Sequence, residues 1–261
     1  MSLHDAYART TPYELAFPEQ GRAGPLAEAV RIEGAARGVD PETLDGFMTL
    51  GAVETFVRSL ADSEHDPAAL RRFGPLAFHG VRFHEADQPV FLVSTHVARY
   101  LVEGAPSGQP RPNPSAGYLQ LPQHLFWTAA AGDAPESIDG IFWCASRARV
   151  LHTLVVTGVR PDRPGLGIVP LPAAPIEDAS TWLELDAREE GGDFSTDLPG
   201  SDIDGLYGVE TPGEVFMLLA RFFAYVESAP HATQRFQPPA DLDREGPRAS
   251  ALPFTRVSLV A

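Results

Sequence analysis

Cys144, His152 and Asp139 are the residues whose types and spacing could support nucleophilic catalysis. The cysteine and the histidine fall on two consecutive predicted strands, and a histidine within hydrogen-bond reach can hold a cysteine sulfur as the reactive thiolate. If the turn is centred between Arg147 and Ala148, the two side chains lie on opposite faces, and a shift of one residue in register places them directly opposite each other. Asp139 could orient such a histidine. Because an unpaired cysteine is among the most often buried residues, a buried structural Cys144 is the favoured interpretation.

Three histidines and a glutamate form a second group of candidate residues. His79, His84 and Glu85 fall in one predicted helix, and His96 follows nearby. Histidines that share a metal on a helix favour a separation of four residues, whereas a separation of five turns the two rings apart by about 140°. Surface or hydrogen-bonded histidines are therefore the favoured interpretation. We expect no bound metal and no cofactor.

Four arginines flank one predicted strand, 150–159. Arg147 and Arg149 precede it, and Arg160 and Arg163 follow it. Guanidinium groups bind carboxylates and phosphates well. A strand of this length spans ~30 Å at ~3.3 Å per residue, so the two pairs cannot share one anion site. We interpret them as two pairs that stabilise the adjoining turns.

The charge composition excludes several classes of protein. The 261-residue chain has a formal net charge of −15, which argues against a nucleic-acid partner because basic residues supply most of that affinity. All 20 basic residues are arginine, so the absent lysine excludes Schiff-base enzymes and P-loop nucleotide binding. A single cysteine fits a reducing compartment, and the N-terminal residues resemble no secretory signal, so we expect a cytoplasmic protein.

The helix predicted at 212–228 is the most apolar element of the chain. Thr211 and Glu214 have the spacing of a capping box, and Pro212 occupies the first helical position, where its missing N–H does no harm. The residues that follow leave almost no polar face, which is typical of an enclosed helix. This segment is near the lower length limit for a membrane span and carries Arg221 at its middle, so we expect no membrane interaction.

Two different periodicities precede this helix. The first hundred residues show helical spacing of apolar residues, with prolines at helix starts. Helices are predicted at 25–37, at 41–60 with a break at Gly51, and at 67–85 with either a kink or a division into two helices at Gly74-Pro75, before a strand at 90–93. Residues 118–171 form runs rich in β-branched and aromatic residues, and their short connections favour an antiparallel meander.

The expected fold is therefore α+β, with a helical N-terminal part followed by an antiparallel β-sheet packed on a buried C-terminal helix. A Pro/Gly-rich linker at 104–116 separates a helical subdomain at 1–103 from an α+β subdomain at 117–261. Residues 229–253, rich in Pro, Ala and charge, are expected to be extended or mobile, and 254–260 to return as an edge strand.

Two hypotheses for function follow. The favoured one is a non-catalytic cytoplasmic binding or interaction protein, whose protein or small-molecule ligand lies between the helical and the α+β part. The alternative is a small hydrolase or transferase that uses Cys144 with His152, or a metal held near His79, His84 and Glu85. The first is favoured because function must be argued from a site, and none of these sites is convincing in sequence. The sequence predicts no oligomeric state.

Overall fold

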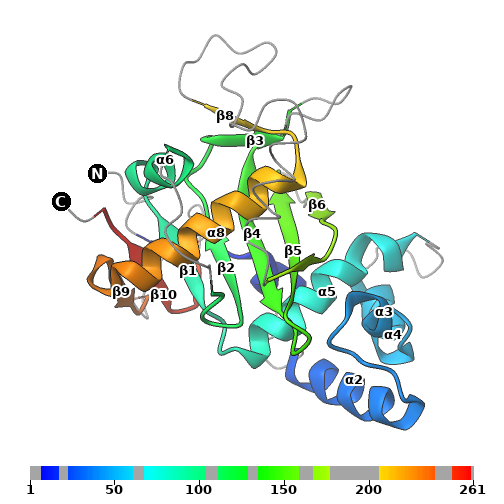
Figure 1. Cartoon of the computed structure of the whole chain (residues 1–261). Coiled ribbons are helices and arrows are strands. Elements are labelled where there is room, and N and C mark those ends of the chain that lie inside the picture. Colours follow the sequence, from blue (N-terminus) through cyan, green and yellow to red (C-terminus); the bar gives the residue numbers. More distant parts are fainter. Residues whose placement is uncertain are drawn as a thin grey trace.

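A mixed β-sheet with helices on both faces forms the body of the protein (Figure 1). The computed structural model describes residues 7–17, 23–60, 68–103, 111–128, 135–158, 167–176, 206–238 and 249–259, and the structural statements below concern these residues. The α+β class expected from the sequence is confirmed. None of the helices in the described ranges is long and apolar enough to cross a membrane.

Helices from the first part of the chain cover one face of the sheet. They are α1 (Pro12–Ala16), α2 (Ala23–Arg37), α3 (Leu44–Met48), α4 (Gly51–Leu60) and α5 (Ala69–Glu85). Helix α5 lies against the sheet and the other four pack around it. The predicted break at Gly51 separates α3 from α4, whereas α5 continues through Pro75 as one helix. Gly74 lets α3 approach α5 closely, because a Cβ atom there would lie 2.1 Å from the Met48 sulfur.

The sheet has the strand order β6-β5-β4-β2-β1-β10-β9, with β7 also pairing with β5. Its strands are β1 (Val90–Val93), β2 (Ala116–Gln120), β4 (Ile138–Ala145), β5 (Val150–Thr157), β6 (Gly167–Pro170), β7 (Ala174–Pro175), β9 (Thr233–Phe236) and β10 (Phe254–Val257). The antiparallel meander is confirmed for β2, β4, β5 and β6. Strand β1 is parallel to both β2 and β10, so the sheet is mixed and not purely antiparallel. A separate parallel pair joins β3 (Phe126–Thr128) to β8 (Tyr207–Val209).

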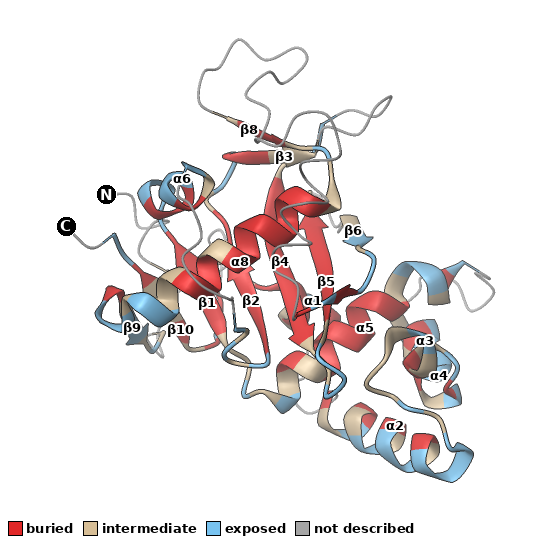
Figure 2. Ribbon diagram, in the orientation of Figure 1, coloured by how far each residue is buried: buried red, intermediate tan, exposed pale blue. Residues whose placement is uncertain are grey.

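The apolar helix predicted near the end of the chain covers the opposite face. Helix α8 (Pro212–Ser228) runs across the strands beside α6 (Thr95–Glu103), as Figure 1 shows. Its capping box is formed, with the Thr211 side chain accepting from the Glu214 backbone N–H and the Glu214 carboxylate accepting from Thr211 N–H at 2.8 Å. Buried residues line most of its length (Figure 2), and they share one core with sheet residues such as Trp143 and Val155.

Three expectations about how the chain is organised can be compared with the structure. Within the segment expected to be extended or mobile, 229–253, the chain forms the 3₁₀ turn η2 (Pro230–Ala232) and then the extended strand β9. Strand β10 lies between β1 and β9, so it is an inner strand and the prediction of an edge strand was wrong. Strand β1 belongs to the predicted helical subdomain yet pairs with β2 beyond the predicted linker. The division into subdomains stays a prediction.

Candidate functional site

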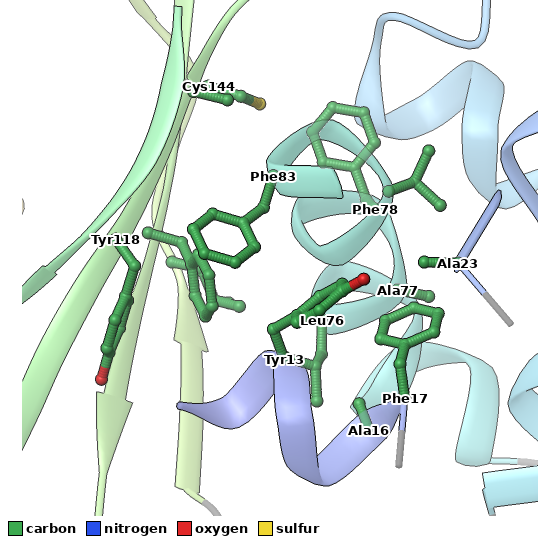
Figure 3. Close-up of a cluster of buried hydrophobic side chains, with 14 of the residues drawn as sticks. Tyr13, Ala16, Phe17, Ala23, Leu76, Ala77, Phe78, Phe83, Tyr118 and Cys144 are labelled. Atoms are coloured by element: carbon green, nitrogen blue, oxygen red, sulfur yellow. The ribbon is translucent and has the colours of Figure 1, made fainter. Parts of the chain in front are cut away.

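The β4–β5 hairpin places Cys144 directly opposite His152. This is the shifted register that puts both side chains on one face of the sheet, the face covered by α5. Figure 3 shows Cys144 projecting from its strand toward α5, near Phe78 and Phe83. The His152 ring packs edge-on against Phe78 at 5.2 Å between ring centroids. Among the described residues, no hydrogen bond joins the Cys144 sulfur to a histidine.

Burial leaves this pair unreactive at neutral pH. Cys144 is 3% exposed, and burial is the main cause that raises the pKa of its thiol to about 12. Burial also lowers the pKa of His152, so the imidazole is neutral near pH 7. Because the thiolate is the nucleophilic form of cysteine, a thiol with this pKa is a weak nucleophile. The arrangement matches a structural cysteine better than a catalytic one.

Asp139 belongs to a different cluster at the far end of β4. Its carboxylate accepts from Arg9 Nε at 3.0 Å and Nη2 at 2.8 Å, and from the Tyr118 hydroxyl. Gln120 completes the cluster, accepting from Arg9 N–H at 2.7 Å and donating to the Arg9 carbonyl at 3.1 Å. Five residues separate Asp139 from Cys144, about 16 Å along a strand at ~3.3 Å per residue. Asp139 therefore does not orient His152.

The four residues considered for metal binding are not brought together. His79 is buried between α5 and the sheet, where its ring lies 6.2 Å from that of Phe142. His84 Nδ1 instead meets the Tyr13 hydroxyl at 3.1 Å, and Glu85 forms an ion pair with Arg82. His96 is exposed on α6, which lies on the other face of the sheet. Across the described ranges, no three acidic, cysteine or histidine side chains gather as a metal site.

A cleft opens between the helical part and the end of the sheet where Cys144 lies. Its volume is about 770 Å³. The described lining residues come from the segment before α3, the C-terminal end of α5, the segment leading into β2, the end of β4 with the β4–β5 turn, and the residue after β7. In chain order they are Glu42, Arg82, Glu85, Ala86, Arg111, Pro112, Ser115, Ala116, Cys144, Ala145, Ser146, Arg147, Arg149 and Ile176. Segments that are distant in sequence thus build one site.

Four arginines and two glutamates are among the described residues that line this cleft. Arg82 Nη1 lies 2.6 Å from Glu85 Oε2, and its Nη2 donates to the Pro41 carbonyl at 3.0 Å. Arg147 Nε lies 2.9 Å from Glu42 Oε1. Both carboxylates among the described lining residues are therefore paired with arginines of the same cleft.

Glu42 ties the helical part to the β4–β5 turn across this cleft. Its Oε1 is paired with Arg147 Nε, and its Oε2 accepts from the Arg147 backbone N–H at 3.2 Å. The Arg147 side chain is 92% exposed, whereas that of Glu42 is 22% exposed. An ion pair with one member this exposed contributes little to stability, about 0–1 kcal/mol.

Two of the four arginines among the described lining residues, Arg147 and Arg149, stand out in the sequence, whereas the residues around them in the cleft do not. Arg147 and Arg149 were interpreted as stabilising their own turn, while the structure pairs Arg147 with Glu42 of another segment. Arg160 and Arg163 lie outside the described residues. Arg82 and Arg111 carry no local signal, because nothing in their own segments indicates the cleft. One usable signal was Arg149, an arginine at the end of a tight hairpin turn, where glycine is the usual residue.

Comparison with known proteins gives little information about function. No family model matches the chain, and no curated protein matches it in sequence. Among solved structures, the crystal structure of AcrVA2 is similar with a TM-score of 0.47 and 8% sequence identity, covering 94% of this chain and 81% of that chain. A similarity at this level carries no argument about activity.

Proposed function

We propose that this is a non-catalytic cytoplasmic binding protein whose ligand lies in the cleft between the helical part and the sheet. The observation that carries this proposal is the cleft itself, about 770 Å³ in volume and lined from both parts of the chain. Small-molecule sites have volumes of roughly 300–1,000 Å³ and often lie where two packed units meet. The single cysteine remains the reason for proposing a reducing compartment.

The chemistry at the cleft favours binding over catalysis. Cys144 lines the cleft, but its thiol has a pKa of about 12 and is not ionised at neutral pH. The other polar lining groups are arginines, glutamates and serines, and guanidinium groups bind anions without exchanging protons at neutral pH. A general base near the Cys144 thiol is needed for the hydrolase or transferase alternative, and His152 forms no hydrogen bond with it in the described structure.

Retention of small molecules from a cell extract tests the proposal. Purified protein is incubated with the extract, washed, and analysed by native mass spectrometry. Ser115→Trp and Ala86→Trp place a large side chain in the cleft, whereas Ala36→Trp adds one to the exposed surface of α2. We expect wild type and Ala36→Trp to retain the same compound, and the two cleft variants to lose it.

The chemical state of the retained compound separates binding from catalysis. If the compound is recovered unchanged after prolonged incubation, the binding proposal is supported. If it is converted, and Cys144→Ala stops the conversion, the hydrolase or transferase alternative is correct instead. Retention by both cleft variants at the wild-type level contradicts the proposed location of the site.

A further inference from the structure

One ion pair joins two walls of the cleft. Glu42 from the helical part and Arg147 from the β4–β5 turn both line it, and Glu42 Oε1 lies 2.9 Å from Arg147 Nε. Glu42 Oε2 accepts a second hydrogen bond, at 3.2 Å, from the Arg147 backbone N–H. We propose that this two-point contact is a latch that holds the cleft closed over Cys144, and that its release opens the cleft. As the entry route of a ligand, the latch rests on the proposed binding function.

Both halves of the latch belong to segments that have hydrogen bonds of their own. The Pro41 carbonyl, next to Glu42, accepts from Arg82 Nη2 at 3.0 Å, which fixes this segment to α5. In the β4–β5 turn, Ser146 N–H donates to the Val150 carbonyl at 2.9 Å. Each segment therefore keeps its shape when the latch breaks, and the opening is a movement of one wall relative to the other.

The latch is weak enough to open in the folded protein. The Arg147 side chain is 92% exposed, and that of Glu42 is 22% exposed. Exposed charge pairs are screened by water and salt, so they contribute little to stability. By contrast, the Asp139 side chain is 6% exposed, and separating it from Arg9 would leave a charge buried without a partner. Of these two ion pairs, only the one at the cleft can break and re-form at small cost.

Cys144 lies behind the latch and can report whether it is open. The residue lines the cleft, yet it is only 3% exposed, and its side chain projects toward α5 (Figure 3). It is the only cysteine of the chain, so the reaction of a thiol reagent with the protein measures access to this one point. A closed latch keeps the reagent out of the cleft, and an open latch admits it.

Labelling of Cys144 with iodoacetamide tests the latch without a known ligand. The reagent is uncharged, so salt does not alter its approach to an acidic chain. The urea-unfolded chain gives the reference rate for an accessible thiol. We expect wild type to react far more slowly than this reference, and Glu42→Ala, which removes both contacts, to react about two- to fivefold faster than wild type. High salt should speed the reaction of wild type and leave that of Glu42→Ala unchanged.

A double-mutant cycle makes the test specific to this pair. Arg147→Ala removes the Nε contact but keeps the backbone N–H, so we expect a smaller increase in rate than in Glu42→Ala. Once Glu42 is replaced, Arg147→Ala should add nothing. Glu28→Ala breaks an exposed ion pair with Arg31 on α2, and its rate should equal that of wild type. Independent increases in the double variant, or the same increase in Glu28→Ala, overturn the proposal.

Urea dependence separates opening of the cleft from unfolding of the chain. A local opening exposes little surface, so the labelling rate should stay nearly constant at urea concentrations well below the unfolding transition. If the rate instead rises from the lowest concentrations with the slope of global unfolding, Cys144 reacts only in unfolded chains and the latch is disproved.

The latch and the proposed function can fail separately. If the extract experiment retains a compound but Glu42→Ala labels at the wild-type rate, the latch is wrong and the binding function stands. If labelling responds as expected and the extract experiment retains nothing, the latch is supported and the binding function fails.

Discussion

The two ends of β4 use charge in opposite ways. At the Asp139 end, one carboxylate with a 6% exposed side chain is matched by Arg9 and by the Tyr118 hydroxyl. At the Cys144 end, four guanidinium groups face two carboxylates around an open cleft. Matched charges in a buried cluster hold the N-terminal segment onto the sheet, whereas charged side chains around an accessible cleft, such as the 92% exposed Arg147, can be reached by a ligand. The first end should thus matter for stability and the second for binding.

The largest expected effect comes from breaking the matched end. Arg9→Met leaves the Asp139 carboxylate buried without its cation, and we expect the free energy of unfolding to fall by ~3–5 kcal/mol. Chemical denaturation at pH 7 measures this loss. Arg31→Met, which breaks the exposed pair with Glu28, is the control and should have a much smaller effect. If the double variant Arg9→Met/Asp139→Leu recovers no stability, the explanation by an unpaired charge is wrong.

The second largest effect is expected at His79, which packs on the apolar middle of β4. His79 packs against Phe142, and burial first, then His152, lowers its pKa from 6.5 to about 3. Since the folded state holds this histidine neutral, His79 leaves stability independent of pH above about 6.5, and it destabilises the fold increasingly as pH falls from 6.5 toward 3, because the unfolded state then takes up a proton that the folded state excludes. The expected loss is roughly 2 kcal/mol between pH 6.5 and 5, at about 1.4 kcal/mol per pH unit.

Substituting His79 isolates this contribution. His79→Leu removes a buried Nδ1 that has no hydrogen-bond partner in the described structure, so we expect near wild-type stability at pH 7 and a weaker loss at pH 5. Urea denaturation at the two pH values measures the difference. His96→Leu, on the exposed surface of α6, should keep the wild-type pH dependence. Equal pH dependence in wild type and His79→Leu would assign the acid sensitivity to other groups.

A smaller effect is expected from breaking the ion pair between Glu42 and Arg147 at the cleft. Glu42→Gln weakens the pairing with Arg147, and we expect the free energy of unfolding to change by no more than ~1 kcal/mol. Thermal and chemical denaturation measure the change. A loss comparable to that of Arg9→Met would show that this tie is structural, and the contrast between the two ends of β4 would disappear.

The smallest effect, and the only one of opposite sign, is expected at Arg149. Glycine fits a φ of 57° better than arginine, so Arg149→Gly should leave stability unchanged or raise it by up to ~1 kcal/mol. Denaturation curves provide the measurement, and Ala148→Gly in the same turn is the control for added backbone entropy. A clear loss of stability in Arg149→Gly would place this arginine among the structural residues.

The parts of the fold that could be predicted are those determined by neighbouring residues. The capping box at Thr211, the break at Gly51 and the antiparallel β4–β5 hairpin each depend on a few consecutive residues. The parallel pairing of β1 with β2 and β10 depends on contacts between distant segments. The sequence of a short apolar run does not indicate which other strand it pairs with. The hairpin register also escaped prediction, because one added residue in the turn moves His152 to the other face.

The residues of the candidate site could be predicted only in part, because their partners lie far away in sequence. Asp139 was recognisable as a polar residue in an apolar strand, but its partner Arg9 lies 130 residues away in sequence. The cleft arginines come from segments around residues 82, 111 and 147, and only folding brings them together. A ligand between the helical part and the sheet was predicted from the Pro/Gly-rich linker and the tail that follows helix 212–228, and its location stays a prediction.

The inner position of β10 has a consequence for synthesis of the chain. Val90 pairs with Phe254. During synthesis, β1 therefore lacks one of its two hydrogen-bonded neighbours until residues near 254 have left the ribosome. Until then, an apolar strand edge is open to other nascent chains, which favours aggregation. A stalled or prematurely terminated chain would therefore present this edge permanently, whereas a completed one closes it with its own β10 and β9.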